Sequence, residues 1–471
     1  MTRARAAGKA VVAYKVGRSA AGAQSAASHT GALAGSDAVY NALFRQYGVI
    51  RAERYSDLID IPLALSAARP LKGNRVAIIT STGGAASLLA DAAGGLGFET
   101  PPPDEATAAK LKALAIDGAT LDRNPIDVTL AGVKSETFRT ILDAVVASPI
   151  YDAVAVVLGS SALREPETVG KPLRECAAAS EKPIVGFVSP DAPQLVRALN
   201  LAGVPTFAAP ESVATVLAAL RRVNETTAIA LIEEQIAVAV DDGVRALLKP
   251  GPLNEAESKQ LFACFGIPAV RETVVASPAA AADAAPAFDG PVVLKILSRD
   301  VLHKSDIGGV AVGIGHADVA ATCAGMARRF TEATTLKPEG FLVQQRVADG
   351  VELILGFHHD PQLGPVILLG MGGVTAELYR DTALRLAPVS RRDAQEMIDE
   401  LKSSPLLTGF RGRPAADIQA LVDAIVAFSE MIGALGDELR EAEINPLFVL
   451  PQGRGVVAAD GVVVVKGARH E

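Results

Sequence analysis

RVAIITSTGGAASLLADAAGGLG, residues 75–97, sets the pattern of the first half of the chain. A short apolar run is followed by a glycine pair and then by a helix-like segment. Three further apolar runs follow, separated by helix-like stretches: AVAVVLG (153–159), PIVGFVS (183–189) and VPTFAA (204–209). Fully apolar runs alternating with helical periods predict parallel strands buried by helices on both faces. Residues 74–222 therefore predict a doubly wound α/β domain, which binds ligands at the carboxyl ends of its strands.

The pattern changes at Leu253. A helix-like segment (254–266) is followed by strand-like runs with little helix between them: GPVVLKIL (290–297), GGVAVGI (308–314), GFLVQQRV (340–347), VELILGFHH (351–359) and GPVILLGMG (364–372). Two longer helical stretches, 391–401 and 415–435, precede a final pair of strand-like runs. Consecutive strands joined by short turns predict an antiparallel sheet in an α+β unit.

The first 68 residues differ from both. A strand-like run (10–14) is followed by GRSAAGAQSAASHTGALAGSD (17–37), which we expect to be a small-residue loop, and by a helix-like stretch (38–47).

Composition narrows the class of protein. The 471 residues are enough for two to four domains at about 100–200 residues each. With 49% hydrophobic and 21% charged residues the chain can bury large cores, and a net charge of -8 provides no general field for nucleic acid or an anionic membrane. Three widely spaced cysteines favour neither a disulfide framework nor a zinc site. The start of the chain does not have a signal-peptide pattern, and no apolar stretch approaches the ~20 residues of a membrane span. We expect a cytoplasmic protein without nucleic-acid or membrane partners.

Two of the six histidines lie in unusual surroundings. His29, in SHTGALAG, is flanked by small residues that let the backbone approach an anion. His303, in KILSRDVLHKSDIGGV, lies among charged residues in a glycine-bounded segment, where a histidine can act as a nucleophile or phosphate carrier. Taken alone, a histidine in either setting is more often an ordinary polar loop histidine.

The glycine pair Gly83 and Gly84 places backbone N–H groups at the start of a helix, where a phosphate or phosphohistidine can bind. The alternative is a strand–helix turn that needs glycine only for close packing.

The C-terminal region contains a third set of candidates. Lys295 lies in a strand-like run and could contact nucleotide phosphates. Glu443 and Asn445 lie two apart on one face of a strand, and Asp460 lies in the next strand-like run. Oxygen ligands of this kind suit magnesium, although such residues are more often simply solvated.

These motifs, in this order, resemble the ADP-forming acyl-CoA (acetyl-CoA) synthetases, relatives of succinyl-CoA synthetase. The stretch around His29 resembles the phosphohistidine loop of the family, and residues 75–98 followed by NPIDVT (124–129) resemble its second ligase domain. VVLKILSRDVLHKSDIGGV (292–310) is the most specific match, to an ATP-grasp domain. The resemblance implies flavodoxin-like parallel-sheet ligase domains followed by an α+β ATP-grasp domain. The implied domains are the C-terminal half of a ligase domain (1–68), a second ligase domain (69–225), a linker (226–250) and the ATP-grasp domain (251–471).

The resemblance also implies roles for individual residues. His29 and His303 would be successive phosphate carriers, and the helix starting at Gly83 and Gly84 would hold the phosphohistidine. Nucleotide contacts would come from Lys295, from Gln344 and Gln345 at the adenine-side hinge, and from Glu352, with Glu377 as a weaker candidate. Magnesium would be held by Glu443, Asn445 and Asp460.

The implied reaction is acyl-CoA + ADP + phosphate ⇌ carboxylate + CoA + ATP. The CoA-binding domain that precedes these parts in the family has no counterpart in the sequence, so we expect CoA chemistry to need a further part. Either a separate CoA-binding chain supplies that part, or the part has been lost by truncation. The resemblance implies a homo-oligomer or a hetero-oligomer with a CoA-binding chain. Two alternatives remain open: a non-catalytic nucleotide-binding regulatory remnant, and an ATP-grasp carboxylate–amine ligase that uses free acyl phosphate.

Overall fold

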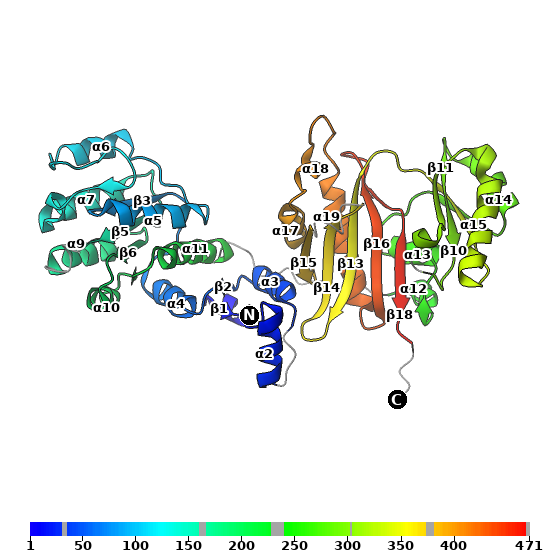
Figure 1. The fold of residues 1–471 in the computed structure, drawn as a ribbon, viewed down its shortest axis with the longest axis horizontal. Helices are drawn as coiled ribbons and strands as arrows, with labels where there is room; N and C mark the ends of the chain where they lie inside the picture. Colours follow the sequence, from blue (N-terminus) through cyan, green and yellow to red (C-terminus); the bar gives the residue numbers. More distant parts are fainter. Residues whose placement is uncertain (31–34, 160–165, 228–239, 302–303, 374–380, 468–471) are drawn as a thin grey trace. The chain divides into compact units, whose positions relative to one another are not determined.

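The computed structural model describes residues 1–30, 35–159, 166–227, 240–301, 304–373 and 381–467. The chain forms two compact units (Figure 1). Met1–Ala32 and Tyr47–Leu231 make the first, and Leu33–Gln46 and Ile232–Glu471 make the second. Each unit is therefore built from two separate stretches of the chain.

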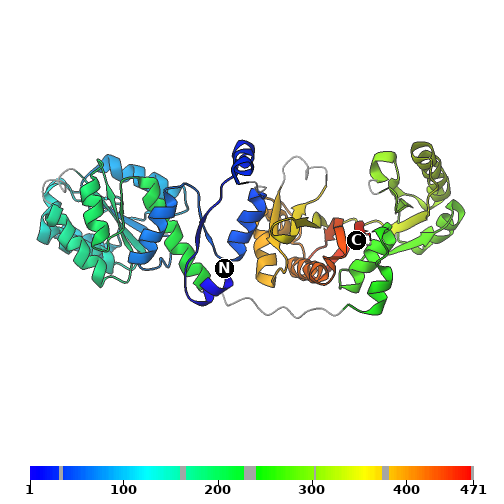
Figure 2. The same ribbon diagram turned by 90° about the horizontal axis from the view of Figure 1, so that it is seen from below.

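A parallel five-stranded sheet forms the centre of the first unit, with the strand order β4-β3-β5-β6-β7. The strands are β3 (Val76–Thr80), β4 (Ile126–Asp127), β5 (Ala153–Leu158), β6 (Ile184–Val188) and β7 (Thr206–Phe207). Helices cover both faces (Figure 2). On one face lie α5 (Gly83–Gly94) and α11 (Pro210–Thr227); on the other lie α6 (Glu105–Lys112), α7 (Ser135–Ala147), α9 (Pro166–Ala179) and α10 (Pro193–Leu201).

The alternation of side chains along β3 explains this layering. Val76 and Ile78 belong to the core under α5 and α11, whereas Ala77 and Ile79 belong to the core under α7 and α9. A strand buried on both faces is apolar at nearly every position, and all five residues of β3 are buried, of which only the last, Thr80, is polar. The predicted doubly wound α/β arrangement is confirmed.

The N-terminal stretch of the first unit is small. Strand β1 (Val12–Tyr14) pairs in parallel with β2 (Ile50–Ala52), and the helices are α1 (Thr2–Ala6), α2 (Ala20–Thr30) and α4 (Asp57–Ala67). The prediction of a loop over residues 17–37 is wrong for its central part, because α2 occupies residues 20–30. Five of its eleven residues are alanine, the residue with the highest helix propensity, and this outweighs the loop-like impression of its small side chains.

The second unit contains two antiparallel sheets. The smaller has the order β11-β10-β12-β9, and the larger has the order β15-β14-β13-β16-β18-β8 with β17 paired to β16. The smaller sheet consists of β9 (Glu272–Val275), β10 (Val292–Leu297), β11 (Val310–Ile314) and β12 (Gly340–Gln345). The larger consists of β8 (Gly251–Pro252), β13 (Val351–Asp360), β14 (Gly364–Met371), β15 (Thr382–Leu386), β16 (Leu439–Val449), β17 (Val456–Ala458) and β18 (Gly461–Val465). The predicted antiparallel α+β unit is confirmed.

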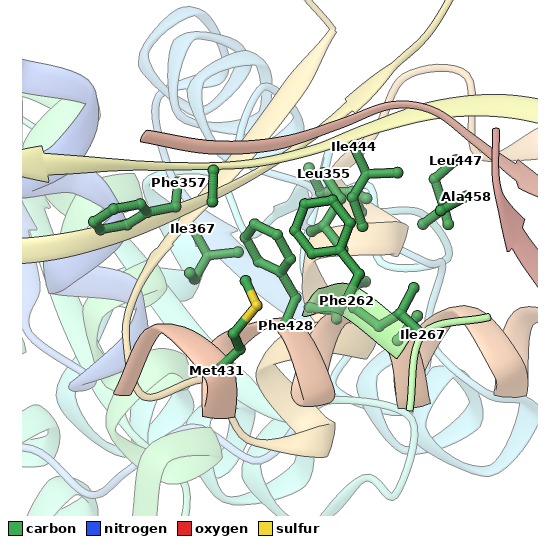
Figure 3. Close-up of a cluster of buried hydrophobic side chains, with 14 of the residues drawn as sticks. Phe262, Ile267, Leu355, Phe357, Ile367, Phe428, Met431, Ile444, Leu447 and Ala458 are labelled. Carbon is green, nitrogen blue, oxygen red and sulfur yellow. The ribbon is translucent and has the colours of Figure 1, made fainter. Parts of the chain in front are cut away.

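Helices cover one face of each of these sheets. Helices α14 (Pro278–Ala284) and α15 (Val319–Thr334) share a core with the smaller sheet. Helices α12 (Asp242–Leu247), α13 (Glu255–Cys264), α17 (Arg391–Glu400), α18 (Pro405–Thr408) and α19 (Ile418–Leu435) share a core with the larger sheet, and α3 (Asp37–Gln46) packs at β15. In Figure 3, Phe262 from α13 and Phe428 and Met431 from α19 face Leu355, Ile367 and Ile444 of the larger sheet.

Helix α19 is apolar along much of its length. In the described part of the chain, α19 is long and apolar enough to cross a membrane by length and composition, with a mean hydropathy of 1.6 over its 18 residues. Its apolar face, including Leu421, Ile425, Phe428 and Ile432, is buried against the larger sheet. The apolar composition of α19 is therefore that of a core helix.

Candidate active site

The best-defined polar site in the second unit is built around Glu255. Helix α13 begins with a capping box, in which Asn254 accepts from the N–H of Glu257 and the Glu257 carboxylate accepts from the N–H of Asn254. This fixed start places Glu255 at the first position of the helix, where it is only 2% exposed. One turn later Lys259 points the same way, and its Nζ lies 2.8 Å from Glu255 Oε1.

Two further lysines converge on the same carboxylate. Lys295, on β10, places Nζ 2.8 Å from Glu255 Oε1, and Lys304 places Nζ 2.7 Å from Glu255 Oε2. Lys304 opens the short 3₁₀ helix η3 (Lys304–Ile307), directly after the segment that contains His303. A single buried carboxylate therefore fixes lysines from three different elements.

The connection between β17 and β18 closes the site from the larger sheet. Lys295 Nζ donates to Asp460 Oδ2 at 2.7 Å and to the Ala459 carbonyl at 2.9 Å. Gln344 on β12 donates through Nε2 to Glu272 Oε2 at 2.6 Å, and also to Glu255 Oε1 and the Ala459 carbonyl. Glu272, on β9, also accepts from Lys259.

We call this set the Glu255 cluster: three lysines, three carboxylates and one amide, namely Glu255, Lys259, Glu272, Lys295, Lys304, Gln344 and Asp460. Its formal charges balance. It joins residues of both sheets of the second unit, so it lies where those two sheets meet.

Electrostatics keep the centre of the cluster ionised. Burial alone would raise the pKa of Glu255, but the charges of Lys295, Lys259 and Lys304 outweigh it and hold that pKa below its ordinary value. Burial would likewise lower the pKa of Lys295, but Glu255 and Asp460 raise it above the ordinary value for lysine. A fully charged lysine is therefore held ready at the junction of the two sheets.

The three residues that the sequence predicts as magnesium ligands are linked to one another, and one of them, Asp460, bonds to Lys295. Asn445 Nδ2 donates to Glu443 Oε1 at 3.1 Å, so these two side chains share one face of β16. The N–H of Asn445 donates to the Asp460 carbonyl at 3.3 Å, which places the third residue next to them. Their donors are the hard oxygens that magnesium prefers, so the set fits a magnesium ion and its phosphate ligands. Among the described residues there is no group of three or more histidines, cysteines and acidic residues that could hold a metal.

The remaining nucleotide candidates lie on neighbouring strands. Gln345 follows Gln344 at the end of β12 and is half-buried. Glu352 is exposed on β13, and its carbonyl accepts from the N–H of Gly372 at 2.8 Å. A Cβ on Gly372 would lie 3.0 Å from the Glu352 carbonyl, so this close approach of two strands needs glycine.

The first unit contains the predicted anion site. Gly83 and Gly84 are the first two residues of α5 and are exposed, and the cap residue Thr82 makes no side-chain hydrogen bond to the helix. Asp127, at the end of β4, lies 3.8 Å from the position of a Cβ on Gly83. The glycine pair therefore stands at the carboxyl edge of the parallel sheet, where such domains bind ligands.

The structure describes the backbone of only one of the two candidate histidines. His29 lies in the last turn of α2, but its side chain is outside the described part of the structure. His303 and Glu377 both lie outside the described residues.

Reasoning from the sequence missed four members of the site: Glu255, Lys259, Glu272 and Lys304. A usable signal was present: Glu255, Ser258, Lys259 and Phe262 follow the spacing of a buried helical face. A glutamate and a lysine at core positions need buried partners, which is the mark of a polar site.

Two parts of the chain match models of known protein domains, and much of the chain is similar to proteins of known activity. Residues 249–465 match the model of an ATP-grasp domain, and residues 1–65 match that of a succinyl-CoA ligase-like flavodoxin domain. The acetate–CoA ligase (ADP-forming) I of Archaeoglobus fulgidus is 34% identical over 95% of this chain, which spans 65% of that protein. The β subunit of acetate–CoA ligase (ADP-forming) II of Pyrococcus furiosus is 33% identical over 45% of this chain and 91% of its own length.

Among solved structures, an acetyl-coenzyme A synthetase 1 of Ca. Korarchaeum cryptofilum in complex with coenzyme A is 37% identical over 46% of this chain and 94% of its own, with a TM-score of 0.43. The chain thus spans about 65% of the length of the curated full-length relatives it matches. On its family matches and its relatives, the chain belongs to the ADP-forming acyl-CoA (acetyl-CoA) synthetase family.

Proposed function

We propose that the chain carries the phosphate-transfer part of an acid–CoA ligase that forms ADP from ATP. The reaction interconverts acyl-CoA, ADP and phosphate with carboxylate, CoA and ATP. Two relatives that match 95% of the chain are named as ADP-forming ligases, one for acetate and one for 4-hydroxybutyrate. We propose a small carboxylate as the acid substrate of this chain.

The Glu255 cluster is the observation that carries the proposal. Lys295 is charged, 5% exposed and aligned by Glu255, Asp460 and a carbonyl. A lysine fixed in this way loses little conformational entropy when it meets a phosphate, and its charge is stronger at low dielectric. We assign Lys295 to the nucleotide phosphates, with Gln344, Gln345 and Glu352 on the nucleotide side of the same site.

Glu443, Asn445 and Asp460 are proposed to hold magnesium. When bound, the ion would neutralise and orient the phosphate oxygens of the nucleotide. The residues themselves bring their oxygens to one side of β16, and Asp460 links them to Lys295.

His29 and His303 are proposed as successive phosphate carriers. In the direction of ATP synthesis, an imidazole nitrogen of His29 attacks the phosphorus of an acyl phosphate, and the carboxylate leaves. His303 then takes the phosphoryl group from His29 and passes it to a terminal oxygen of ADP. The N–H groups of Gly83 and Gly84 would stabilise the phosphohistidine at the amino end of α5. Two carriers keep each transfer at contact distance when two sites are far apart.

CoA and the carboxylate are proposed as substrates bound with the help of a further part. Relatives occur both as single chains and as separate α and β subunits. We propose either a homo-oligomer or a hetero-oligomer with a CoA-binding chain, and a cytoplasmic location. The mass of the complex purified at native expression level would separate the two assemblies, and cell fractionation would test the location.

A transfer of phosphate from ATP to histidine tests the proposal. The chain is incubated with magnesium and ATP labelled at the γ-phosphate, and protein-bound label that is lost in acid but stable in base is counted. We expect label on the wild type and on His29→Ala, and none on His303→Ala or Lys295→Met. His316→Ala is the matched control, because His316 lies outside the cluster and bonds only to the Gly290 carbonyl among its described partners.

Three outcomes would overturn the proposal. Unlabelled wild-type protein that binds nucleotide would support the regulatory remnant instead. Label that is undiminished in His303→Ala would remove the relay from that residue. Acyl phosphate released without any labelled protein would point to a carboxylate–amine ligase.

A further inference from the structure

A cavity opens at the amino edge of the parallel sheet in the first unit. Its walls come from the ends of α4, α9 and α10 and from the start of β6, all labelled in Figure 1. Its volume is about 400 Å³, within the range of about 300–1,000 Å³ that is typical of small-molecule sites. Because the strands of this sheet are parallel, the cavity lies at the opposite edge from Gly83 and Gly84. We call it the amino-edge cavity.

Three basic side chains from three different elements line the amino-edge cavity. Arg69 follows α4, Arg174 lies on α9, and Lys182 lies two residues before the first residue of β6. Among the described residues that line the cavity there is no aspartate or glutamate. The cavity is therefore locally positive in a chain whose net charge is -8.

The charges of these three side chains are only weakly compensated within the described part of the chain. Lys182 is half-buried, and its Nζ donates to the Ser148 carbonyl at 2.5 Å rather than to a carboxylate. Arg174 pairs with Glu167 at 2.6 Å, but the Glu167 side chain is 76% exposed, and an ion pair of this kind contributes little. Arg69 is exposed and has no partner among the described residues. Burial lowers the pKa of Lys182, so an anion in the cavity would stabilise its charged form.

The other walls combine small side chains with backbone acceptors. Ala177 and Ala178 lie in the last turn of α9, where the carbonyls have no donor within the helix. Such helix ends carry a partial negative charge, which a purely anionic ligand would not match. A ligand that fits these walls therefore has an anionic group for the cations and hydroxyl groups that donate to carbonyls.

We propose that the amino-edge cavity binds a small phosphate ester that also bears hydroxyl groups, such as a sugar phosphate. Its phosphate contacts Arg174 and Lys182, with Arg69 at the exposed side, because guanidinium and ammonium groups bind phosphate through charge-assisted hydrogen bonds. Its hydroxyl groups donate to carbonyls at the end of α9. The site is independent of the phosphate transfer proposed above, which uses other residues.

Isothermal titration of glucose 6-phosphate and of glycerol 3-phosphate into the full chain tests the proposal. We expect at least one ester to bind saturably, with a Kd below about 1 mM. Glucose and inorganic phosphate should each bind more weakly, because each offers only one of the two kinds of group. The binding should persist in Lys295→Met, since that lysine lies in the second unit. No ATP is present, so a failure to label His303 would not affect this result.

Substitution of the three cations locates the bound ester. Arg174→Gln and Lys182→Met should each weaken binding by about tenfold, and Arg69→Gln by about threefold, because its exposed charge is screened by salt. Lys110→Met is the matched control, since Lys110 is exposed on α6 of the same unit and does not line the cavity. Arg69→Gln removes no described hydrogen bond and supplies a further variant if another one does not fold.

Three results would overturn the proposal. If neither ester binds, the three cations only offset the partial negative charge of the helix ends. If inorganic phosphate binds as tightly as the esters, the assignment of a hydroxylated ester is wrong. Unchanged affinity in Arg174→Gln and Lys182→Met would place the bound ester elsewhere in the chain. Differential scanning calorimetry gives a second readout, because a ligand of the folded first unit raises the unfolding midpoint of that unit.

Discussion

Replacement of Glu255 by glutamine tests the arrangement of the Glu255 cluster. The substitution keeps the shape of the side chain and removes one negative charge from a site whose charges balance. Lys259 keeps Glu272 and Lys295 keeps Asp460, but Lys304 keeps no carboxylate partner among the described residues. Loss of one partner from a buried ion pair costs about 3–5 kcal/mol.

We expect the lower end of this range, because the glutamine oxygen still accepts a hydrogen bond and two lysines remain paired. For a unit of this size, about 3 kcal/mol corresponds to a fall of roughly 6–12 °C in the unfolding midpoint of the second unit. Differential scanning calorimetry of the full chain measures it, since two units can unfold in separate transitions.

Controls make the result specific. Glu430→Gln removes an exposed carboxylate from α19 in the same unit and should change stability by less than about 0.5 kcal/mol. The double variant Glu255→Gln/Lys304→Met removes the unpaired lysine as well and should recover part of the loss. Equal midpoints for Glu255→Gln and Glu430→Gln would refute the reasoning, because the buried carboxylate would then have no larger role than an exposed one.

Three further predictions concern the pH dependence of Glu255, the amide of Asn124 and the packing at Gly461. The pKa of Glu255 is lower in the folded chain than its ordinary value of 4.5. Its ionised carboxylate therefore contributes fully to the free energy of unfolding above about pH 4.5, and this contribution is lost as the pH falls below that value. Urea midpoints measured from pH 7 to pH 3 should fall less steeply in Glu255→Gln than in wild type. Asn124→Leu removes the amide that bonds to backbone groups of β3 and to the Pro101 carbonyl, and should cost the first unit about 2–3 kcal/mol in a urea titration; an unchanged midpoint would show that water replaces the amide. Gly461→Ala would place a Cβ 2.5 Å from Phe262 Cε2 and should destabilise the second unit by about 1–3 kcal/mol, whereas Gly433→Ala, which meets no atom within 4 Å, should stabilise it slightly; a reversed order in calorimetry would contradict the packing at Phe262.

Much of the fold could be predicted because its elements follow local rules. The alternation of apolar runs and helical periods predicted β3, β5 and β6 with their covering helices, since a buried parallel strand is apolar at nearly every position. Helix α2 was missed because the small residues of 17–37 suit both a loop and an alanine-rich helix.

The candidate site was predicted only in part. Lys295 and the three proposed magnesium ligands are brought together by pairing of β16 with β18 and by the approach of the second sheet. Glu255 could not be ranked as their common partner, because Lys295 and Lys304 lie 40 and 49 residues from it in the chain and meet it only in the fold. The contact of α3 with β15 joins residues about 340 apart and has no local signal in the sequence.

Isothermal titration of ADP with magnesium into wild-type protein and into Lys295→Met tests the central claim most directly. The account predicts saturable binding to the wild type and at least about tenfold weaker binding to Lys295→Met, because a charge-assisted contact to phosphate contributes about 1.5–3 kcal/mol. Lys337→Met, at an exposed lysine of the same unit, should bind like the wild type. Equal affinities of the wild type and Lys295→Met would contradict the assignment of the nucleotide to the Glu255 cluster.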